Sequence, residues 1–134
     1  MMYDALVIGG GPAGATTALR LAQNGWSVAL IEKSAFPRRK VCGEFLSATS
    51  LPVIKHLGIS APFFRLAGPE IRRVAVFAGD DTVSAPMPAA FHPCRWGRAL
   101  GREHLDTLLL QKAAEAGVQV WQPWTATDVR EQHD

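Results

Sequence analysis

Cysteine is scarce in this 134-residue chain, which contains only Cys42 and Cys94. Small secreted domains that depend on disulfides usually carry more, so a disulfide-stabilised extracellular domain is not expected. The N-terminus also lacks a basic segment, and the apolar stretch in "MMYDALVIGG" is short and ends at glycines. The sequence therefore predicts no signal peptide and no transmembrane span, and it favours a cytoplasmic location with reduced thiols.

A strong charge of one sign is also missing. Fourteen lysines and arginines face twelve acidic residues, which gives a net charge of +2. That excess is too small to indicate a nucleic-acid-binding protein. The four histidines, His56, His92, His104 and His133, show no metal-ligand spacing with cysteines or acids, so no metal site is predicted. The length suggests one domain or part of one.

Short apolar runs alternate with helical patterns along the chain. Residues 3–8 and 27–31 are typical of strands buried on both faces, and residues 13–24 between them are typical of a helix that ends at Gly25. Such a strand–helix–strand unit is expected to be parallel and right-handed. The other predicted elements are a loop at 33–43, a helix at 44–57 interrupted near Pro52, an irregular segment at 61–70, a β-hairpin of 72–78 and 82–87, a helix at 102–116 and strands at 118–121 and 126–129.

A glycine-rich turn lies between the first strand and the first helix. Gly9, Gly11 and Gly14 form the pattern G-x-G-x-x-G. Gly9 permits a tight turn, Gly11 lets a pyrophosphate approach the backbone, and Gly14 lets the helix pack closely on the strand. Because the first N–H groups of a helix have no internal partner, this turn predicts an anion site. The alternative is an ordinary glycine-rich turn.

An acidic residue ends the second strand. Glu32 follows Gly14 by 18 positions, where a carboxylate accepts hydrogen bonds from the ribose hydroxyls of an adenosine and repels a 2′-phosphate. The alternative is a solvated carboxylate at a strand end. Together with the glycines, Glu32 predicts a dinucleotide site that disfavours NADP.

Three stretches resemble one group of flavoproteins. "DALVIGGGPAG", followed by "ALRLAQNGWSVALIEK", resembles the N-terminal FAD-binding segment of flavoprotein oxidoreductases. "FPRRKVCGEFLS" resembles the loop after the second strand in geranylgeranyl reductase-like and flavin-halogenase-like proteins, and "GREHLDTLLLQKAAEAGVQV" is similar to a helix of that group and of p-hydroxybenzoate hydroxylase-type monooxygenases. The resemblance implies a Rossmann-like α/β FAD-binding fold with a parallel sheet and an inserted β-hairpin.

The resemblance also implies which residues bind FAD. Residues 11–14 line the pyrophosphate, Glu32 binds the adenosine ribose, and a backbone group at Ala126 meets the adenine. Cys42 and Gly43 match a loop that passes close to the ribityl chain and flavin, and Arg102 matches an arginine on the ribityl or phosphate portion. The full set of expected FAD-binding residues is Gly9, Gly11, Pro12, Ala13, Gly14, Glu32, Lys33, Arg39, Cys42, Gly43, Arg102 and Ala126.

Several of these residues also have simpler interpretations. The cluster Arg38-Arg39-Lys40 neutralises a pyrophosphate or is merely part of a solvated loop. Arg102 is the first residue of a predicted helix, where a cation is unfavourable unless an anion lies nearby. The alternative is a surface residue whose aliphatic stem covers apolar neighbours. Cys42 has a flavin-linked role or is a small residue packed near the cofactor.

Residues 1–134 are expected to be the front part of an FAD-binding domain, because the closing strands and the substrate domain of the resembled proteins are absent. The parent protein is then a flavin-dependent oxidoreductase with a small-molecule substrate that the sequence does not identify, and this portion alone is expected to be inactive. The alternatives are a non-catalytic nucleotide-binding module and an NAD-dependent dehydrogenase, for which no catalytic group is found. An exposed sheet edge is expected to favour self-association.

Overall fold

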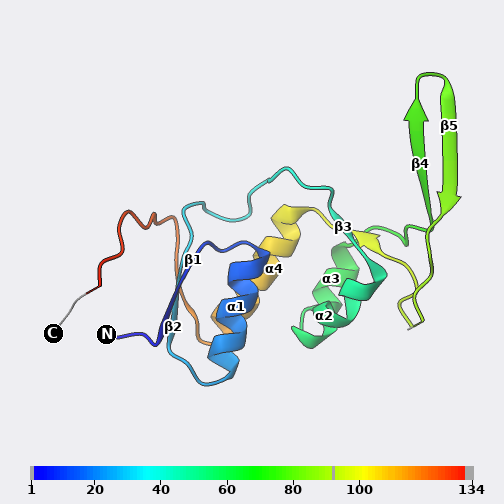
Figure 1. Cartoon of the computed structure of the whole chain (residues 1–134). Helices are drawn as coiled ribbons and strands as arrows, with labels where there is room; N and C mark the ends of the chain where they lie inside the picture. The colour runs from blue at the N-terminus through cyan, green and yellow to red at the C-terminus, as the bar shows by residue number, and fades with distance from the viewer. Residues whose placement is uncertain (1, 92, 132–134) are drawn as a thin grey trace. The chain divides into compact units, whose positions relative to one another are not determined.

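A computed structural model describes residues 2–91 and 93–131. These residues divide into two compact units, one made of the residues up to Lys40 and from Arg102 onward, the other of Val41–Gly101. Figure 1 shows the helices and strands of both units. Within the described ranges, no helix has the length and apolar character that crossing a lipid bilayer requires.

The first unit contains a three-stranded parallel sheet in the order β1–β2–β7. Figure 1 labels β1 and β2 of this sheet. The unit consists of β1 (Ala5–Ile8), α1 (Pro12–Gln23), β2 (Val28–Ile31), α4 (Arg102–Glu115) and β7 (Gln119–Trp121). Leu30 of β2 pairs with Val7 of β1 on one side and with Val120 of β7 on the other. The predicted α/β fold with a parallel sheet is therefore confirmed. In such a sheet the carboxyl ends of all strands lie at one edge.

The core of the first unit comes from the central strand and two helices. All of β2 except Ile31 is buried, and α1 packs against both β2 and α4. The buried residues of the two helices are Ala15, Ala18 and Leu19 in α1 and Leu105, Asp106, Leu109, Leu110 and Ala113 in α4. Leu21 and Ala22, near the end of α1, are only half-buried. Glycines with positive φ follow both helices, Gly25 at +87° and Gly117 at +98°, as the sequence indicated.

Strand β1 is less buried than predicted. Its side chains alternate between half-buried and exposed, and Leu6 and Ile8 are 51% and 56% exposed. Val7 points to the other face, where its Cγ1 lies close to Gly14 of α1. The prediction of burial on both faces was therefore wrong for β1, because the described residues cover only the face on which α1 packs.

The second unit has its own small core. Its elements are β3 (Phe45–Leu46), the 3₁₀ helix η1 (Ala48–Ser50), α2 (Leu51–His56), α3 (Ser60–Leu66), β4 (Arg73–Ala78), β5 (Asp81–Pro86) and β6 (Arg98–Ala99). The core residues are Ala48, Leu51, Ile54, Leu57, Ile59, Phe63 and Leu100. Strand β3 pairs antiparallel with β6. The buried residues thus come mainly from η1, α2, α3 and the turn between the two helices, with Leu100 directly after β6.

Three of the sequence-based element predictions were wrong. Residues 44–57 do not form one helix, because Phe45 and Leu46 pair with Ala99 and Arg98 instead. Residues 61–70 are not irregular throughout, since α3 tolerates a proline in its first turn, where no backbone N–H is needed. Residues 126–129 form no strand.

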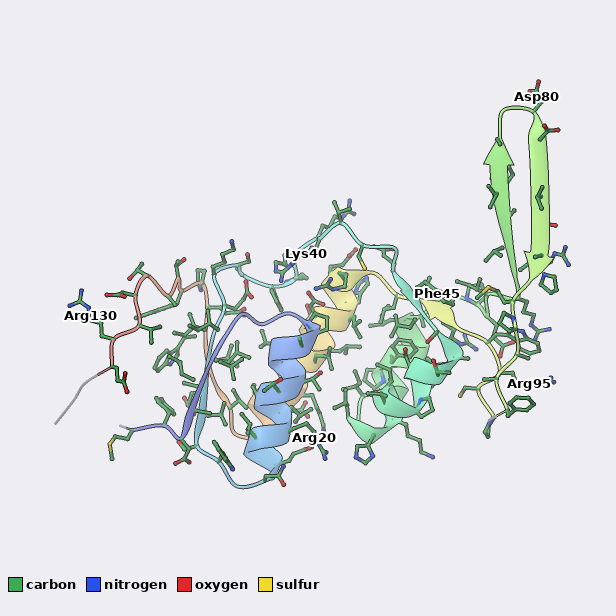
Figure 2. All side chains as sticks on the ribbon, viewed as in Figure 1. Arg20, Lys40, Phe45, Asp80, Arg95 and Arg130 are labelled. Carbon is green, nitrogen blue, oxygen red and sulfur yellow. The ribbon has the colours of Figure 1, made fainter. Side chains whose placement is uncertain are left out.

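The inserted β-hairpin is confirmed as β4 and β5, which pair antiparallel from Arg73↔Pro86 to Ala78↔Asp81. The turn at Gly79 has a positive φ of +59°, and Figure 2 shows Asp80 at its tip. Every residue of both six-residue strands is exposed. The hairpin therefore adds no core residue to the described part of the chain.

Candidate functional site

A cleft of about 690 Å³ opens in the first unit, where the strands of the parallel sheet end. It is lined by Ile8, Gly9, Gly11, Ile31, Glu32, Lys33, Ser34, Arg38, Arg39, Lys40, Trp124, Thr125 and Ala126. Ile8 and Ile31 are the last residues of β1 and β2, and the others follow β1, β2 or β7. Figure 2 shows Lys40 on the loop after β2. Ligands of open parallel sheets bind at this edge, and the volume lies within the range of small-ligand pockets.

The glycine-rich turn joins β1 to α1 at the floor of the cleft. Gly9 has a φ of +103°, which residues with a side chain rarely adopt. A Cβ on Gly14 would collide with the carbonyl oxygen of Gly9. Helix α1 begins at Pro12 after the N-cap Gly11, and no side chain caps its N-terminus. The backbone geometry therefore requires glycine at positions 9 and 14. Beside this turn, the first N–H groups of α1 have no side-chain acceptor.

Glu32 is 5% exposed and is held by two backbone groups. Its Oε2 accepts the N–H of Gly10 at 2.7 Å, and its Oε1 accepts the N–H of Ser34 at 2.8 Å. Burial alone raises the pKa of Glu32, but these two N–H groups and the charge of Arg38 outweigh it, so the pKa lies below its ordinary value. Glu32 is therefore a fixed carboxylate at neutral pH. Each of its oxygens accepts one backbone bond and keeps a further acceptor position.

A second buried carboxylate lies in α4. Asp106 is fully buried and accepts two hydrogen bonds from Arg102, from Nε to Oδ1 at 2.6 Å and from Nη2 to Oδ2 at 2.9 Å. Arg38 approaches both acids, with its Nη2 3.6 Å from Asp106 Oδ2 and its Nε 3.8 Å from Glu32 Oε1. The Nη2 of Arg102 also lies 3.6 Å from where a Cβ on Gly11 would be. Two arginines and two acids thus form one network beside the glycine turn.

The structure brings most of the predicted FAD-binding residues together. Those that line the cleft are Gly9, Gly11, Glu32, Lys33, Arg39 and Ala126, while Pro12, Ala13 and Gly14 form the first turn of α1 and Arg102 contacts the network. Cys42 and Gly43 belong to the second unit, where both are exposed and Cys42 Sγ lies 3.5 Å from the N of Glu44. The roles of all these residues in binding FAD stay predictions.

Sequence reasoning missed several residues of the site. Gly10 and Ser34 hold Glu32, and Asp106 holds Arg102, yet none of these three was predicted. In the cluster at 38–40, the predicted member Arg39 is exposed, whereas Arg38 is the one that reaches the buried acids. The aspartate of the quoted "GREHLDTLLL" was a usable signal, because Arg102 and Asp106 are four apart on one helix.

No group of three or more His, Cys, Asp and Glu side chains suited to a metal ion is present among residues 2–91 and 93–131. Two of the histidines considered above, His92 and His133, lie outside those ranges.

Several known proteins are similar to this chain in sequence and fold. A flavin-dependent halogenase of Armillaria mellea is 34% identical over 127 residues, which are 89% of this chain and 24% of that protein. A geranylgeranyl bacteriochlorophyll reductase-like protein of Thermoplasma acidophilum has a solved structure that superposes with a TM-score of 0.68 at 30% identity, covering 89% of this chain and 29% of that one. A crystal structure of 2-methyl-3-hydroxypyridine-5-carboxylic acid oxygenase superposes with a TM-score of 0.71 at 30% identity, covering 90% and 31%.

These proteins are the halogenase, reductase and monooxygenase relatives that the resemblance implied. The chain spans about a quarter to a third of the length of each. The family described as FAD binding domain matches residues 2–134, almost the whole sequence. The chain therefore belongs to the FAD binding domain family, and its cofactor is FAD.

Proposed function

We propose that this chain is the FAD-binding portion of a flavin-dependent oxidoreductase of the reductase or monooxygenase type. The observation that carries the proposal is the buried carboxylate of Glu32, fixed by Gly10 and Ser34 beside the glycine turn. When bound, the flavin accepts and passes on electrons or hydride. The residues of this chain bind the cofactor, orient it and set the charge around it.

The turn after β1 fits the diphosphate of FAD. Gly9 and Gly14 keep side chains away from the start of α1, and the N–H groups there have no side-chain acceptor. Lys33, Arg39 and Lys40 line the same cleft and add positive charge. Backbone donors, a helix N-terminus and cations together favour a bound diphosphate.

Glu32 fits the adenosine ribose. Each carboxylate oxygen already accepts one N–H, which fixes its position and leaves lone pairs for the 2′- and 3′-hydroxyls. A 2′-phosphate would place two negative charges side by side in a partly buried site. FAD carries no such phosphate, so this acid supports FAD and disfavours NADP. We assign Ala126 and Trp124, which line the cleft after β7, to the adenine end.

The names of the three relatives describe halogenation, reduction and oxygenation. Flavin redox chemistry is common to these reactions, whereas their substrates differ. We therefore propose a flavin-dependent activity on a small molecule for the whole protein, and no nucleic-acid partner, since the net charge is only +2. We also propose a cytoplasmic location, which the low cysteine content supports.

Titration of the purified chain with FAD and with ADP tests this function. We expect flavin absorption bands to stay with the protein through gel filtration, and ADP to bind measurably in calorimetry. Glu32→Gln should weaken ADP binding by about 1.5–3 kcal/mol, the value of a hydrogen bond to a charged group. Glu115→Gln, at an exposed position on α4, is the matched control. Equal ADP affinity of Glu32→Gln and wild type would contradict the ribose role.

A further inference from the structure

We propose that Asp106 is the positioning residue of the diphosphate site, because it orients Arg102 and Arg38 toward the bound anion. The inference rests on the proposed function, since it assigns a role within the same FAD site. Its starting point is a carboxylate that is fully buried and has both oxygens engaged by arginines.

The contact between Asp106 and Arg102 fixes a guanidinium rather than merely neutralising it. Both hydrogen bonds come from one edge of the planar guanidinium, from Nε and Nη2, in the bidentate arrangement that sets its plane and direction. The two residues are one turn apart in α4. With that plane fixed, Nη2 lies beside Gly11, the residue that caps the N-terminus of α1. Arg102 is thereby presented to the position where the turn accepts an anion.

Arg38 lies on the loop after β2 and approaches the same carboxylate, Asp106. Its guanidinium lies over the ring of Phe36, 4.8 Å from the ring centroid, and contacts Asp106 and Glu32 with its Nη2 and Nε. One aromatic ring and two carboxylates thus restrict the guanidinium of this loop arginine. Neighbouring Arg39 lines the cleft but is exposed.

The Nε of Arg38 is buried and has no hydrogen-bond partner among the described residues. Its distance to Glu32 Oε1, 3.8 Å, is beyond hydrogen-bond range, so the attraction between them is electrostatic. A buried N–H without an acceptor is costly. An oxygen of a ligand in the cleft that Arg38 lines would supply the missing acceptor.

The charges of the network balance before any ligand binds. Asp106 and Glu32 offset Arg102 and Arg38, so the network does not repel an anion as two isolated acids would. The remaining cations of the cleft, Lys33, Arg39 and Lys40, and the N-terminus of α1 are then available to a diphosphate. Asp106 therefore orients the two arginines, while the network of two acids and two arginines stays neutral.

A merely structural role for Asp106 would tie α4 to the loop after β2 without regard to the ligand. The two roles differ in their effect on ligands with and without phosphates. ADP carries the diphosphate, whereas adenosine occupies only the ribose and adenine positions. A structural role changes both affinities together, and a positioning role changes that of ADP alone.

The experiment is calorimetric titration of the chain with ADP and with adenosine. For Asp106→Asn we expect the Kd of ADP to rise at least tenfold and that of adenosine to change less than twofold. Arg38→Gln should also weaken ADP selectively, by about fivefold or more, because it removes one guanidinium. The matched control Arg20→Gln, an exposed arginine of α1 that does not line the cleft, should change the Kd of ADP less than threefold.

The outcomes separate this inference from the proposed function. If the wild-type chain binds neither ADP nor adenosine, the proposed function is wrong. If the wild type binds both and a folded Asp106→Asn protein loses both equally, or loses neither, the positioning role is wrong. Should circular dichroism show that Asp106→Asn does not fold, Arg38→Gln decides, and an effect no larger than that of Arg20→Gln overturns the inference.

Discussion

The carboxylate of Glu32 accepts the backbone N–H of Gly10 at 2.7 Å, although the two residues lie 22 positions apart. This bond joins the end of β2 to the centre of the glycine turn. It explains why Gly10 is a glycine as well, since a Cβ there would come within 3.1 Å of the Cβ of Glu32. The acid therefore shapes the turn in addition to facing the cleft.

The first prediction concerns acid stability. The folded-state pKa of Glu32 is lowered from 4.5, so ionised Glu32 stabilises the fold fully above about pH 4.5. This contribution is lost as the pH falls through the folded-state pKa. We expect Glu32→Gln to reduce the free energy of unfolding by about 1–3 kcal/mol at pH 7. In urea titrations, its difference from wild type should shrink between pH 5 and about pH 3. A difference independent of pH would show that the charge of Glu32 contributes nothing.

The second prediction concerns the close approach at Gly14. Gly14→Ala places a methyl group against the carbonyl oxygen of Gly9, so either the turn or α1 must shift. We expect a loss of about 1–3 kcal/mol in the free energy of unfolding, as for other overpacked sites, together with weaker ADP binding. Gly43→Ala is the control, because a Cβ at Gly43 meets no atom within 4 Å. Chemical denaturation of the two variants should differ, and equal stability would contradict the tight contact.

The third prediction uses tryptophan fluorescence. Trp124 lines the cleft, and its backbone N–H donates to the carbonyl oxygen of Glu32 at 2.9 Å. ADP bound beside Glu32 should therefore change the emission of Trp124. We expect Trp124→Phe to lose at least half of the ADP-induced change, while Trp26→Phe keeps it, since Trp26 follows α1 and does not line this cleft. An unchanged signal in Trp124→Phe would place the ligand elsewhere.

The fourth prediction concerns self-association. Leu6 is 51% exposed on the edge strand β1, and apolar side chains on such a strand favour pairing between copies of a chain. We expect the chain to associate at high concentration in sedimentation velocity, and Leu6→Lys to weaken the association several-fold. Val53→Lys is a control of matched exposure, 53%, on helix α2. A wild-type chain that sediments as a monomer at all concentrations would contradict the prediction.

Sequence reasoning worked best where structure is determined locally. The glycine turn, helix α1 and strand β2 follow one another within about thirty residues, and their patterns depend on near neighbours. The hairpin was likewise predicted from one glycine turn between two short strands. Glu32 was placed in the site because its distance from Gly14 is set by a single helix and strand.

Non-local contacts account for most of what was missed. Phe45 becomes a strand residue only because Ala99, far along the chain, pairs with it. The importance of Arg38 over Arg39 depends on Asp106, a residue of a helix that begins more than sixty positions later. Neither pairing leaves a periodic pattern in the sequence. Helix α3 was missed within residues 61–70, which were expected to be irregular, although Pro62 lies in the first turn, where a helix tolerates proline.

Strand β7 joins the parallel sheet through Val120, which pairs with Leu30 of β2. Ninety positions separate these partners, and closing a loop of that length costs about 4 kcal/mol of chain entropy. During synthesis the ribosome must release the whole of Val41–Gly101 before the third strand can emerge. At a synthesis rate of about 5–20 residues per second, several seconds pass between the synthesis of β2 and that of β7. Nascent chains at this stage expose one edge of β2, so they should depend on chaperones more than finished chains do.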